Sequence, residues 1–534
     1  MKSRTSTYIT ATILFAVLAV PIRLAAQHHR YKLIDLGTFG GPESYINPAF
    51  TFGSHHQVNH RGTVVGGSAT SIPTTPVSNG FVCGGLDGTV PFVNHAFEWK
   101  RGTTTDLGAL PGGNNCSVGT SINTRGEIVG VSENGAFDPV FGTNAVGGVL
   151  WKDGQIIDLG TLGGPSSSAD EINGRGQVVG FALDAISDPV SIVYFGLAGL
   201  TNGTQTRAYL WEDGVMQDLG TLSGPDAVAL FVNERGQVAG FSYTNSTLNP
   251  VTGLPTTHPF VWTKETGMKD LGSLGGSLGW ANSESGGFNN RGEMIGISNV
   301  AGDMIAHPFL WDGEKLIDLN TATIGGNPVT ANEISDAGEV IGTAVFPNGA
   351  SDAYLWKDGA AVNLGTLPGD CLSEAFAING RRQIIGASVN CVSGATRSFL
   401  WENGSMVDLS SLISSGSSLR LVETRAINDR GEIAGIGVPP GCTVIDTKCG
   451  HAFVLIPCDD DHRGVEGCDY SIVGTADVSN NAAPARQPLP ISQPSASMMR
   501  MTNASRNGLL QWWLGGPNDV VNGPIPPIIS NNGT

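Results

Sequence analysis

Two groups of polar residues have the side chains and close spacing that metal ions require. One is a set of histidines: His55, His56 and His60. The other is a run of aspartates: Asp459, Asp460 and Asp461. No partner carboxylate lies near the histidines in the sequence, and the aspartate run lacks the alternating spacing of an EF-hand. We therefore expect solvated loops and no cofactor, with Ca²⁺ at the aspartate run as the alternative.

Carboxylates that could cut a glycosidic bond also occur, at Asp138, Asp184 and Asp188. Hydrolysis needs two such groups about 5–9.5 Å apart, and nothing in the sequence pairs them. The glycine-rich stretch 160–167 resembles a phosphate-binding loop, but it has no lysine and recurs along the chain, so we interpret it as a turn. We predict no catalytic residue.

The chain has eight cysteines, an even number that favours disulfides in an exported protein. Eight cysteines allow 105 connectivities. Proximity in the sequence suggests Cys83–Cys116, Cys371–Cys391, Cys442–Cys449 and Cys458–Cys468. The alternative for the last four cysteines is a zinc site with four thiolates.

The first residues have the features of a secretory signal. Lys2 and Arg4 precede an apolar run at 8–20, and the expected cleavage lies between Ala26 and Gln27. An uncleaved membrane anchor is the alternative. The formal net charge of −18 argues against a nucleic-acid or anionic-membrane partner. We expect a secreted, periplasmic or extracellular monomer with no membrane span after signal removal.

Three motifs recur eight times in a fixed order, so the chain is a repeat protein. The first is Asp-Leu-Gly or a variant of it, and its aspartate or asparagine lies at 35, 106, 158, 218, 270, 318, 363 and 408. The second is Asn-x-x-Gly after an apolar residue, with serine once, at 59, 123, 173, 233, 289, 335, 379 and 428. The third is a short strand that ends in tryptophan, except for a last copy that ends in Leu455: Trp99, Trp151, Trp211, Trp262, Trp311, Trp356 and Trp401.

The turn residues between these motifs predict how the strands pair. Asn-x-x-Gly between apolar runs fits a type I turn followed by a left-handed glycine, with the asparagine side chain capping the turn. Asp-Gly after the tryptophan strands, as at 153–154, is typical of a tight hairpin. Two hairpins in series make a four-stranded antiparallel sheet. Because every copy has them, we expect the Asp-Leu-Gly aspartate and the turn asparagine to bond backbone groups.

A four-stranded sheet of short strands cannot bury both faces alone, so neighbouring sheets must cover it. Units of this size, repeated at intervals that fall to 45 residues, are typical of propeller blades. The repeated tryptophans would then be anchors between blades, each worth about 4–6 kcal/mol at most. Surface aromatics lining a sugar groove are the alternative.

The two ends of the repeat region predict closure. Residues 31–37 form an Asp-Leu-Gly strand with no aromatic strand before it, and 451–457 form an aromatic strand with no Asp-Leu-Gly after it. We expect these strands to pair and close an all-β, eight-bladed propeller over 27–457. An open solenoid and a seven-bladed ring are the alternatives. Outside it lie a signal peptide (1–26), a cysteine-bounded acidic segment (458–474) and a disordered low-complexity tail (475–534).

These motifs resemble the HAF-repeat family of extracellular bacterial proteins. The resemblance covers 31–457 and rests on HAF at 95–97 and 451–453, DLGTLGG at 158–164 and the IN-x-x-G turns. Other copies read HPF, AYL, SFL or GVL. The resemblance implies secretion and a propeller-like fold, and it implies no reaction.

Function should be sought in what does not repeat. The connections between the second and third strands are long in the first four units, at 68–94, 131–147, 181–206 and 241–257. Loops on a rigid scaffold often carry function, so we predict a non-catalytic scaffold that binds glycan or protein partners through this enlarged loop face. The alternatives are an extracellular polysaccharide hydrolase or lyase and a structural cell-surface component. An acid with a raised pKa in a central cavity would favour the enzyme.

Overall fold

The computed structural model describes residues 27–46, 56–84, 92–112, 114–196, 199–281, 286–442 and 449–474. The predicted signal peptide with Ala26, His55 and the predicted tail 475–534 lie outside these residues.

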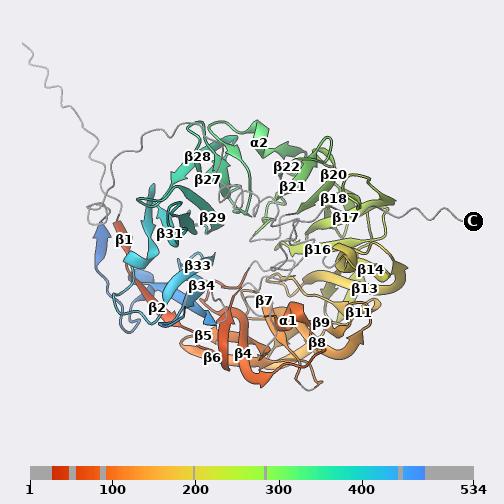
Figure 1. The fold of residues 1–534 in the computed structure, drawn as a ribbon, viewed down its shortest axis with the longest axis horizontal. Coiled ribbons are helices and arrows are strands. Elements are labelled where there is room, and N and C mark those ends of the chain that lie inside the picture. The colour runs from red at the N-terminus through yellow and green to blue at the C-terminus, as the bar shows by residue number, and fades with distance from the viewer. Residues whose placement is uncertain are drawn as a thin grey trace, which may run out of the picture.

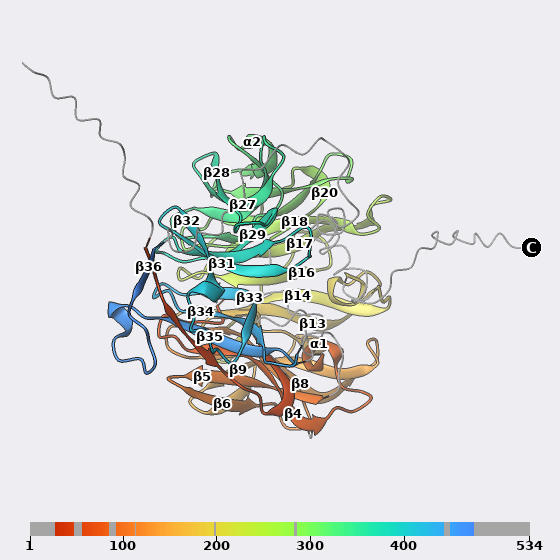
Figure 2. The same cartoon turned by 60° about the vertical axis from the view of Figure 1, so that its left-hand side comes forward.

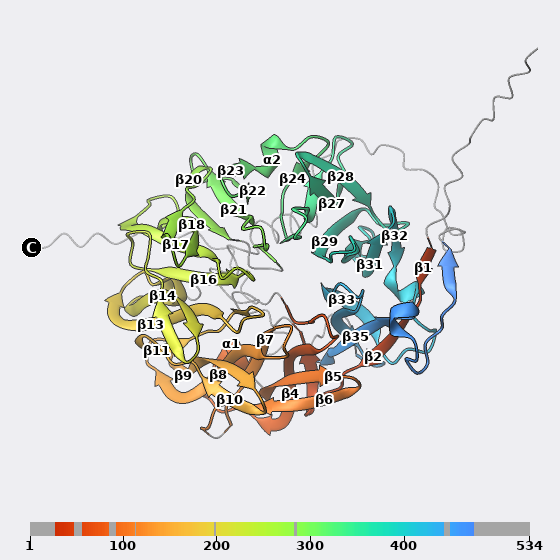
Figure 3. The same ribbon diagram turned by 180° about the vertical axis from the view of Figure 1, so that it is seen from behind.

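The described chain is all-β and is built from four-stranded antiparallel units, as the turn chemistry predicted. Successive units follow one another around a common centre, and first strands such as β7, β16 and β29 lie towards it (Figures 1 and 3). The first unit contains β3 (Gly40–Tyr45), β4 (Val64–Pro73), β5 (Phe92–Lys100) and β6 (Thr103–Gly108). The next contains β7 (Ser117–Ile122), β8 (Ile128–Asp138), β9 (Thr143–Lys152) and β10 (Gln155–Asp158).

The remaining units repeat this order. One has a split first strand: β11 (Gly163–Ser167), β12 (Glu171–Ile172), β13 (Val178–Asp188), β14 (Gly203–Glu212) and β15 (Val215–Asp218). The next two are β16 (Ala227–Val232), β17 (Val238–Leu248), β18 (Pro255–Thr263) and β19 (Gly267–Asp270), then β20 (Gly275–Ala281), β21 (Met294–Val300), β22 (Ala306–Trp311) and β23 (Leu316–Asp318). The following two are β24 (Asn327–Pro328), β25 (Glu333–Ile334), β26 (Val340–Val345), β27 (Ser351–Lys357) and β28 (Ala360–Gly365), then β29 (Leu372–Ile378), β30 (Ile384–Val389), β31 (Thr396–Glu402) and β32 (Ser405–Asp408).

The two ends of the repeat region share one sheet. Strands β33 (Arg420–Ile427), β34 (Ile433–Val438) and β35 (His451–Pro457) take their fourth strand from the other end of the chain, β2 (Tyr31–Asp35). Tyr31 lies opposite Pro457 and Asp35 opposite Phe453, and the Leu36 amide donates to the Ala452 carbonyl at 3.0 Å. The strands that the sequence left without neighbours therefore pair with each other.

A second contact between the ends lies outside this sheet. Strand β1 (Gln27–His29) pairs with β36 (Ile472–Gly474), which Figure 2 brings forward. The segment before β36 is held by the Cys458–Cys468 disulfide. In the middle of β1, His28 is completely buried and its Nδ1 lies 2.9 Å from Glu402 Oε1. The acidic segment 458–474 is thus docked against the repeat region.

Helices are short in the described residues: α1 (Gly80–Cys83), α2 (Leu319–Ala322), the π-helical turn η1 (Ile192–Gly196) and the 3-10 turns η2 (Leu409–Ser411) and η4 (Asp460–His462). None of the helices in the described part of the chain has the length and hydropathy that crossing a membrane requires.

The strand-end tryptophans pack in clusters that include residues of the preceding unit. Six of them are at most 9% exposed, and Trp401 is partly buried. Trp151, for example, contacts Val65 and Leu110 and donates from its indole nitrogen to the Leu107 carbonyl at 3.0 Å. Leu455, in the last copy, is buried in the same kind of cluster. The core therefore lies between units.

The Asn-x-x-Gly and Asp-Gly turns have the predicted geometry. At one of the former, the Gly176 amide donates to the Asn173 carbonyl and Gly176 has a φ of +85°. In the hairpin after Trp151, both Asp153 (φ +52°) and Gly154 (φ +73°) are left-handed, which matches the twist of the flanking strands.

The enlarged connections of the first units are mostly extended hairpins rather than free loops. Strands β8, β13 and β17 reach 11 residues, whereas β26 and β30 have six. Hydrogen bonds join one hairpin to the next, such as Tyr194 Oη to Asp138 Oδ2 at 2.8 Å and Asn249 Nδ2 to Asp303 Oδ2 at 3.0 Å. Much of the enlarged face is thus committed to contacts between units.

Candidate functional site

The turn asparagines form a hydrogen-bonded series around the centre. In each pair, the side-chain amide donates to the backbone carbonyl of the turn residue in the next unit, at 2.8–3.1 Å. The series runs through Asn59, Asn123, Asn173, Asn233, Asn289 and Ser335, and then from Asn379 to Asn428. Asn428 donates to the Asn59 carbonyl at 2.9 Å, so the last turn is bonded to the first.

Each of these asparagines except Asn59, whose amide makes a single donation, is fully used by the scaffold. Asn123 Oδ1 accepts the amides of Arg125 and Glu127, both at 3.0 Å, and its Nδ2 donates to Asn173 O and to Glu127 Oε2. The predicted backbone role of the turn asparagine is therefore correct, and its amide has no capacity left for a ligand.

The series has one gap. At the position of Ser335 the side chain is too short to reach the next turn, and no side-chain link from Ser335 to Asn379 occurs in this described stretch. The turn backbone is nevertheless the same, because the Gly338 amide donates to Ser335 O at 2.9 Å. Residues that depart from the repeat therefore gather where these two units meet.

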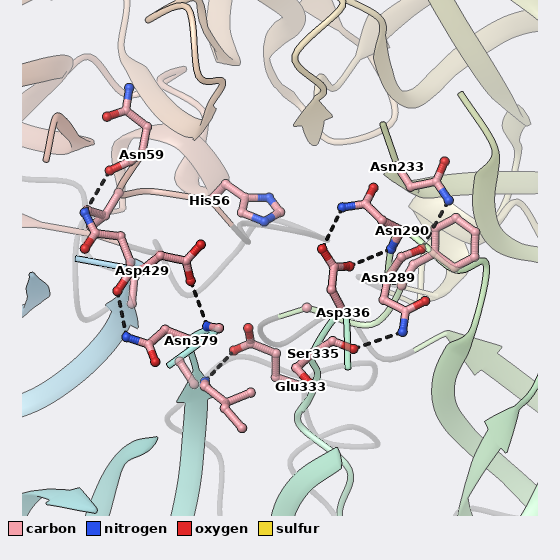
Figure 4. Close-up of a pocket in the computed structure, with 18 of the residues that line it drawn as sticks. His56, Asn59, Asn233, Asn289, Asn290, Glu333, Ser335, Asp336, Asn379 and Asp429 are labelled. Carbon is pink, nitrogen blue, oxygen red and sulfur yellow. Dashed lines mark hydrogen bonds between the residues drawn. The ribbon is translucent and has the colours of Figure 1, made fainter. Parts of the chain in front are cut away.

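The turns enclose a central cavity of about 840 Å³ (Figure 4). Its walls carry the turn residues together with aromatic and ionisable side chains from the innermost strands: His56, Glu171, Phe231, Phe288, Glu333 and Arg425. A cavity of this size can hold a drug-sized ligand or a small oligosaccharide unit. The two glutamates are departures from the repeat, since only two copies have Glu-Ile before the turn residue.

Glu171 and His56 form a held pair in this cavity. Glu171 Oε2 accepts the Val232 amide of the next unit at 2.8 Å, and Oε1 lies 2.8 Å from His56 Nδ1. Glu171 is 5% exposed, whereas 60% of the His56 side chain is exposed to the cavity. Burial would lower the pKa of His56, but the hydrogen bond and charge of Glu171, with Glu333 and Glu234 beyond, raise it.

Glu333 lies in the same wall, and no basic side chain in the described part of the chain forms an ion pair with it. Its Oε2 accepts the Ile378 amide at 3.3 Å, the counterpart of the bond that Glu171 makes. Burial raises the pKa of Glu333 to about 8, although the charge of His56 and the Ile378 bond act in the opposite direction. Near neutral pH the cavity therefore contains a carboxylic acid.

A second series of bonds holds carboxylates at the cavity rim. Here the side chain just after one turn residue accepts the backbone amide of the corresponding residue in the preceding unit. Glu234 accepts from Gly174 at 2.8 Å, Asp336 from Asn290 at 2.8 Å, and Asp429 from Gly380 at 2.7 Å. The rim acids are thus oriented before any ligand arrives.

The groups left over are mainly acceptors. The turn amides other than that of Asn59 are saturated, while the exposed rim residues Glu234, Asp336 and Asp429 keep further lone pairs. The Arg425 guanidinium lies 2.7 Å from Glu423 Oε1 and over the Phe376 ring. The arrangement suits a ligand rich in hydrogen-bond donors, such as a polyol or an amine.

The three histidines singled out in the sequence do not share one site in the structure. His56 pairs with Glu171, His60 Nδ1 lies 3.5 Å from Asp429 Oδ2, and His55 is outside the described residues. Two of the three histidines do line the central cavity, but each has its own carboxylate from another unit.

The carboxylates in the enlarged connections lie away from the cavity walls. Asp138 is buried and accepts the Tyr194 hydroxyl, Asp188 is buried at the end of β13, and Asp184 Oδ1 accepts the Ile186 amide at 2.8 Å. Strand pairing places Asp184 opposite Gly163.

The three aspartates of the run at 459–461 likewise each have a separate partner. Asp459 Oδ1 lies 2.6 Å from His462 Nδ1, Asp460 bonds Arg463, and Asp461 lies 2.8 Å from Arg381. In the described ranges, the one cluster with metal-like proximity is Cys83, Cys116 and Glu133, and its cysteines are joined to each other.

The disulfides are those that proximity in the sequence suggested. The structure joins Cys83–Cys116, Cys371–Cys391, Cys442–Cys449 and Cys458–Cys468.

A pair that the sequence analysis missed explains the HAF motif. Its histidine bonds the aspartate of Asp-Leu-Gly on the neighbouring strand, as in His451 Nδ1 to Asp35 Oδ1 at 3.0 Å. The same oxygen accepts the Gly37 amide at 2.9 Å. Burial would raise the pKa of Asp35, but these hydrogen bonds lower it. The signal was present in the sequence, because two of the four copies without histidine have an arginine at this position, Arg207 or Arg397, that pairs with the same aspartate.

No protein-family model matches the chain, and no curated protein matches it. Among solved structures, it is similar to the β-propeller domain of the trilobed protease from Pyrococcus furiosus, with 10% identity, a TM-score of 0.37 and coverage of 68% of this chain and 97% of that one. An acylaminoacyl peptidase matches with 12% identity and a TM-score of 0.37, over 75% of this chain and 60% of the peptidase. A Mycobacterium tuberculosis puromycin-hydrolyzing peptidase matches with 13% identity and the same TM-score, over 76% and 62%. The chain thus spans about three fifths of the length of these two peptidases.

Proposed function

We propose that the chain is a secreted, eight-bladed β-propeller that acts as a binding scaffold and takes its ligand in the central cavity. The β2–β35 pairing supports ring closure, because it gives the last unit its outer strand. The bond from Asn428 to Asn59 supports closure at the inner rim. Four disulfides support an oxidising location. Membership of the HAF-repeat family, export by a signal peptide and the monomeric state remain predictions.

The observation that carries this proposal is the cavity, with its pre-oriented acids at Glu234, Asp336 and Asp429. Phe288, which is partly exposed in the same wall, offers an apolar face on which a sugar ring can pack. Acceptors beside an aromatic ring fit a glycan, whose hydroxyls donate, or a protein segment that presents an amine.

This site differs from the enlarged loop face that the sequence favoured. In that face, residues 190–194 are largely committed to contacts with the next unit. Exposed apolar tips remain there at Phe137, Ile186 and Leu248, so a partner on that side stays a prediction.

The test is a glycan and peptide screen on the full chain, repeated with EDTA. For any ligand found, Asp336→Asn and Asp429→Asn should weaken binding at least tenfold, because each removes a charged acceptor from the rim. Glu265→Gln, an exposed change on a hairpin turn, is the matched control. Wild-type affinity in both rim variants would refute the cavity as the binding site. Loss of binding with EDTA would indicate that Ca²⁺ takes part in binding.

A polysaccharide hydrolase is the second candidate, and Glu333 is the observation that favours it. A carboxylic acid that is protonated at neutral pH can donate a proton to a leaving oxygen, while the His56–Glu171 pair can accept one from water. Glu333→Gln should then abolish product release while ligand still binds. If no ligand that binds is converted to a product, the non-catalytic binding scaffold remains the proposed function.

A further inference from the structure

The long connection between β13 and β14 is fastened to the neighbouring unit. Within it, Ile192, Val193 and Tyr194 are at most 3% exposed and pack against apolar residues that include Val228 and Tyr243. Tyr243 Oη also donates to the Val190 carbonyl at 3.1 Å. This connection is therefore part of the core between two units.

The polar fastening centres on Asp226, which precedes β16 and is completely buried. Its Oδ2 accepts the Ile192 amide at 2.5 Å, and its Oδ1 accepts the Thr206 amide at 3.0 Å. A carboxylate that accepts two backbone amides is well stabilised as an anion.

A second buried carboxyl lies against the first. Asp188 is 4% exposed, and its Oδ1 accepts the Val190 amide at 2.9 Å. Its Oδ2 is buried and receives no hydrogen-bond donor from the described residues. The two carboxyls bond amides only two residues apart, Val190 and Ile192, and a side-chain hydrogen bond between the carboxyls is among the causes that raise the pKa of Asp226. Two carboxylates cannot donate to each other, so the contact is favourable only with a proton between them.

The surrounding charged and titratable groups do not replace that proton. Tyr243, from β17, is a neutral phenol because burial and the charges of Asp226 and Asp188 raise its pKa. Tyr194 donates to Asp138. The nearby Arg207 is engaged with Asp218 and with the carbonyl of Pro225.

We propose that Asp188 and Asp226 form a one-proton latch, which fastens the β13–β14 connection to the β16–β19 unit and opens when the proton is lost. Opening separates the carboxyls and exposes the apolar face of Ile192 and Tyr194. The apolar surface that the enlarged face of the molecule exposes then depends on pH.

The direction of the pH dependence follows from the pair. Burial, and then the charge of Asp188, raise the pKa of Asp226 well above its ordinary value. A raised pKa means that the closed latch is fully stable below the ordinary aspartate pKa. It loses stability as the pH rises toward the raised pKa. Over that interval one proton leaves on opening, so the opening equilibrium shifts about tenfold per pH unit.

The test is hydrogen exchange of the full chain from pH 5 to pH 9, with protection factors for the amides of Ile192 and Thr206. Wild type should lose protection about tenfold per pH unit. Asp188→Asn should show no such slope, because its amide donates to Asp226 permanently. The exposed change Asp213→Asn is the control for lost charge and should behave as wild type.

Wild-type protection factors that do not change with pH would overturn the latch, and this result needs no variant. So would an Asp188→Asn protein that keeps the wild-type slope. Asp226→Asn should lose protection at every pH, because its NH₂ group meets a backbone donor. Wild-type protection in that variant would overturn the assignment of Asp226 as the acceptor.

Discussion

Replacing Asn428 with alanine removes the hydrogen bond that joins the last turn of the repeat to the first. The side chain accepts the amides of Arg430 and Glu432, both at 3.0 Å, and donates to Asn59 O at 2.9 Å and to Glu432 Oε2 at 2.6 Å. Asn428 is 5% exposed, so water cannot fully replace these partners. At about 1 kcal/mol for each bond, the expected loss of unfolding free energy is about 4 kcal/mol.

The matched variant is Asn123→Ala, which removes the same four kinds of bond between units that are consecutive in the chain. If the ring is closed in solution, the two variants should lose equal stability. For a repeat region of about 400 residues, 4 kcal/mol lowers the melting temperature by roughly 5 °C. Urea and thermal unfolding of both proteins provide the comparison. A near-neutral Asn428→Ala beside a costly Asn123→Ala would show that the ends are not joined at the inner rim.

Three further predictions concern other parts of the molecule. Ser335→Asn should fill the gap in the asparagine series by donating to Asn379 O, and it should raise the unfolding free energy by about 1 kcal/mol. An unchanged or lower unfolding free energy, measured by urea unfolding, would contradict this. Because the pKa of Glu333 is raised, the folded protein should lose stability as the pH rises from 4.5 to about 8. In Glu333→Gln the melting temperature should depend less on pH over this range. Equal plots of melting temperature against pH for both proteins would exclude a buried acid at this position. Cys458→Ser with Cys468→Ser should cost about 3 kcal/mol under oxidising conditions, by the entropy of a ten-residue loop. After full reduction, which opens the other three disulfides in both proteins, variant and wild type should unfold alike, and equal stability under oxidising conditions would contradict the prediction.

Much of the fold follows from features that repeat or are local in the sequence. Asn-x-x-Gly and Asp-Gly turns specify hairpins because their backbone needs are met by the residues themselves, as Asp153 and Gly154 illustrate. The four disulfides join cysteines 7 to 33 positions apart, so proximity alone was informative. The partners of the terminal strands could be predicted because one copy of each motif lacked its neighbour.

The cavity could not be predicted in the same way. Glu171 and His56 come from different units, and their meeting depends on how the units are arranged around the centre. The same is true of Ile192 and Tyr194, which the sequence shows as part of an insertion but which the structure buries.

Sequence alone therefore determined the strand order, the turns and the partners of the terminal strands, because these depend on backbone chemistry that every copy satisfies for itself. Only the tertiary structure decided which side chains face the centre and which charges lie together. Those contacts join residues as far apart as Asn428 and Asn59, and no local preference specifies them. They depend on the side-by-side packing of units, which brings Glu333 into a wall with few basic neighbours and raises its pKa.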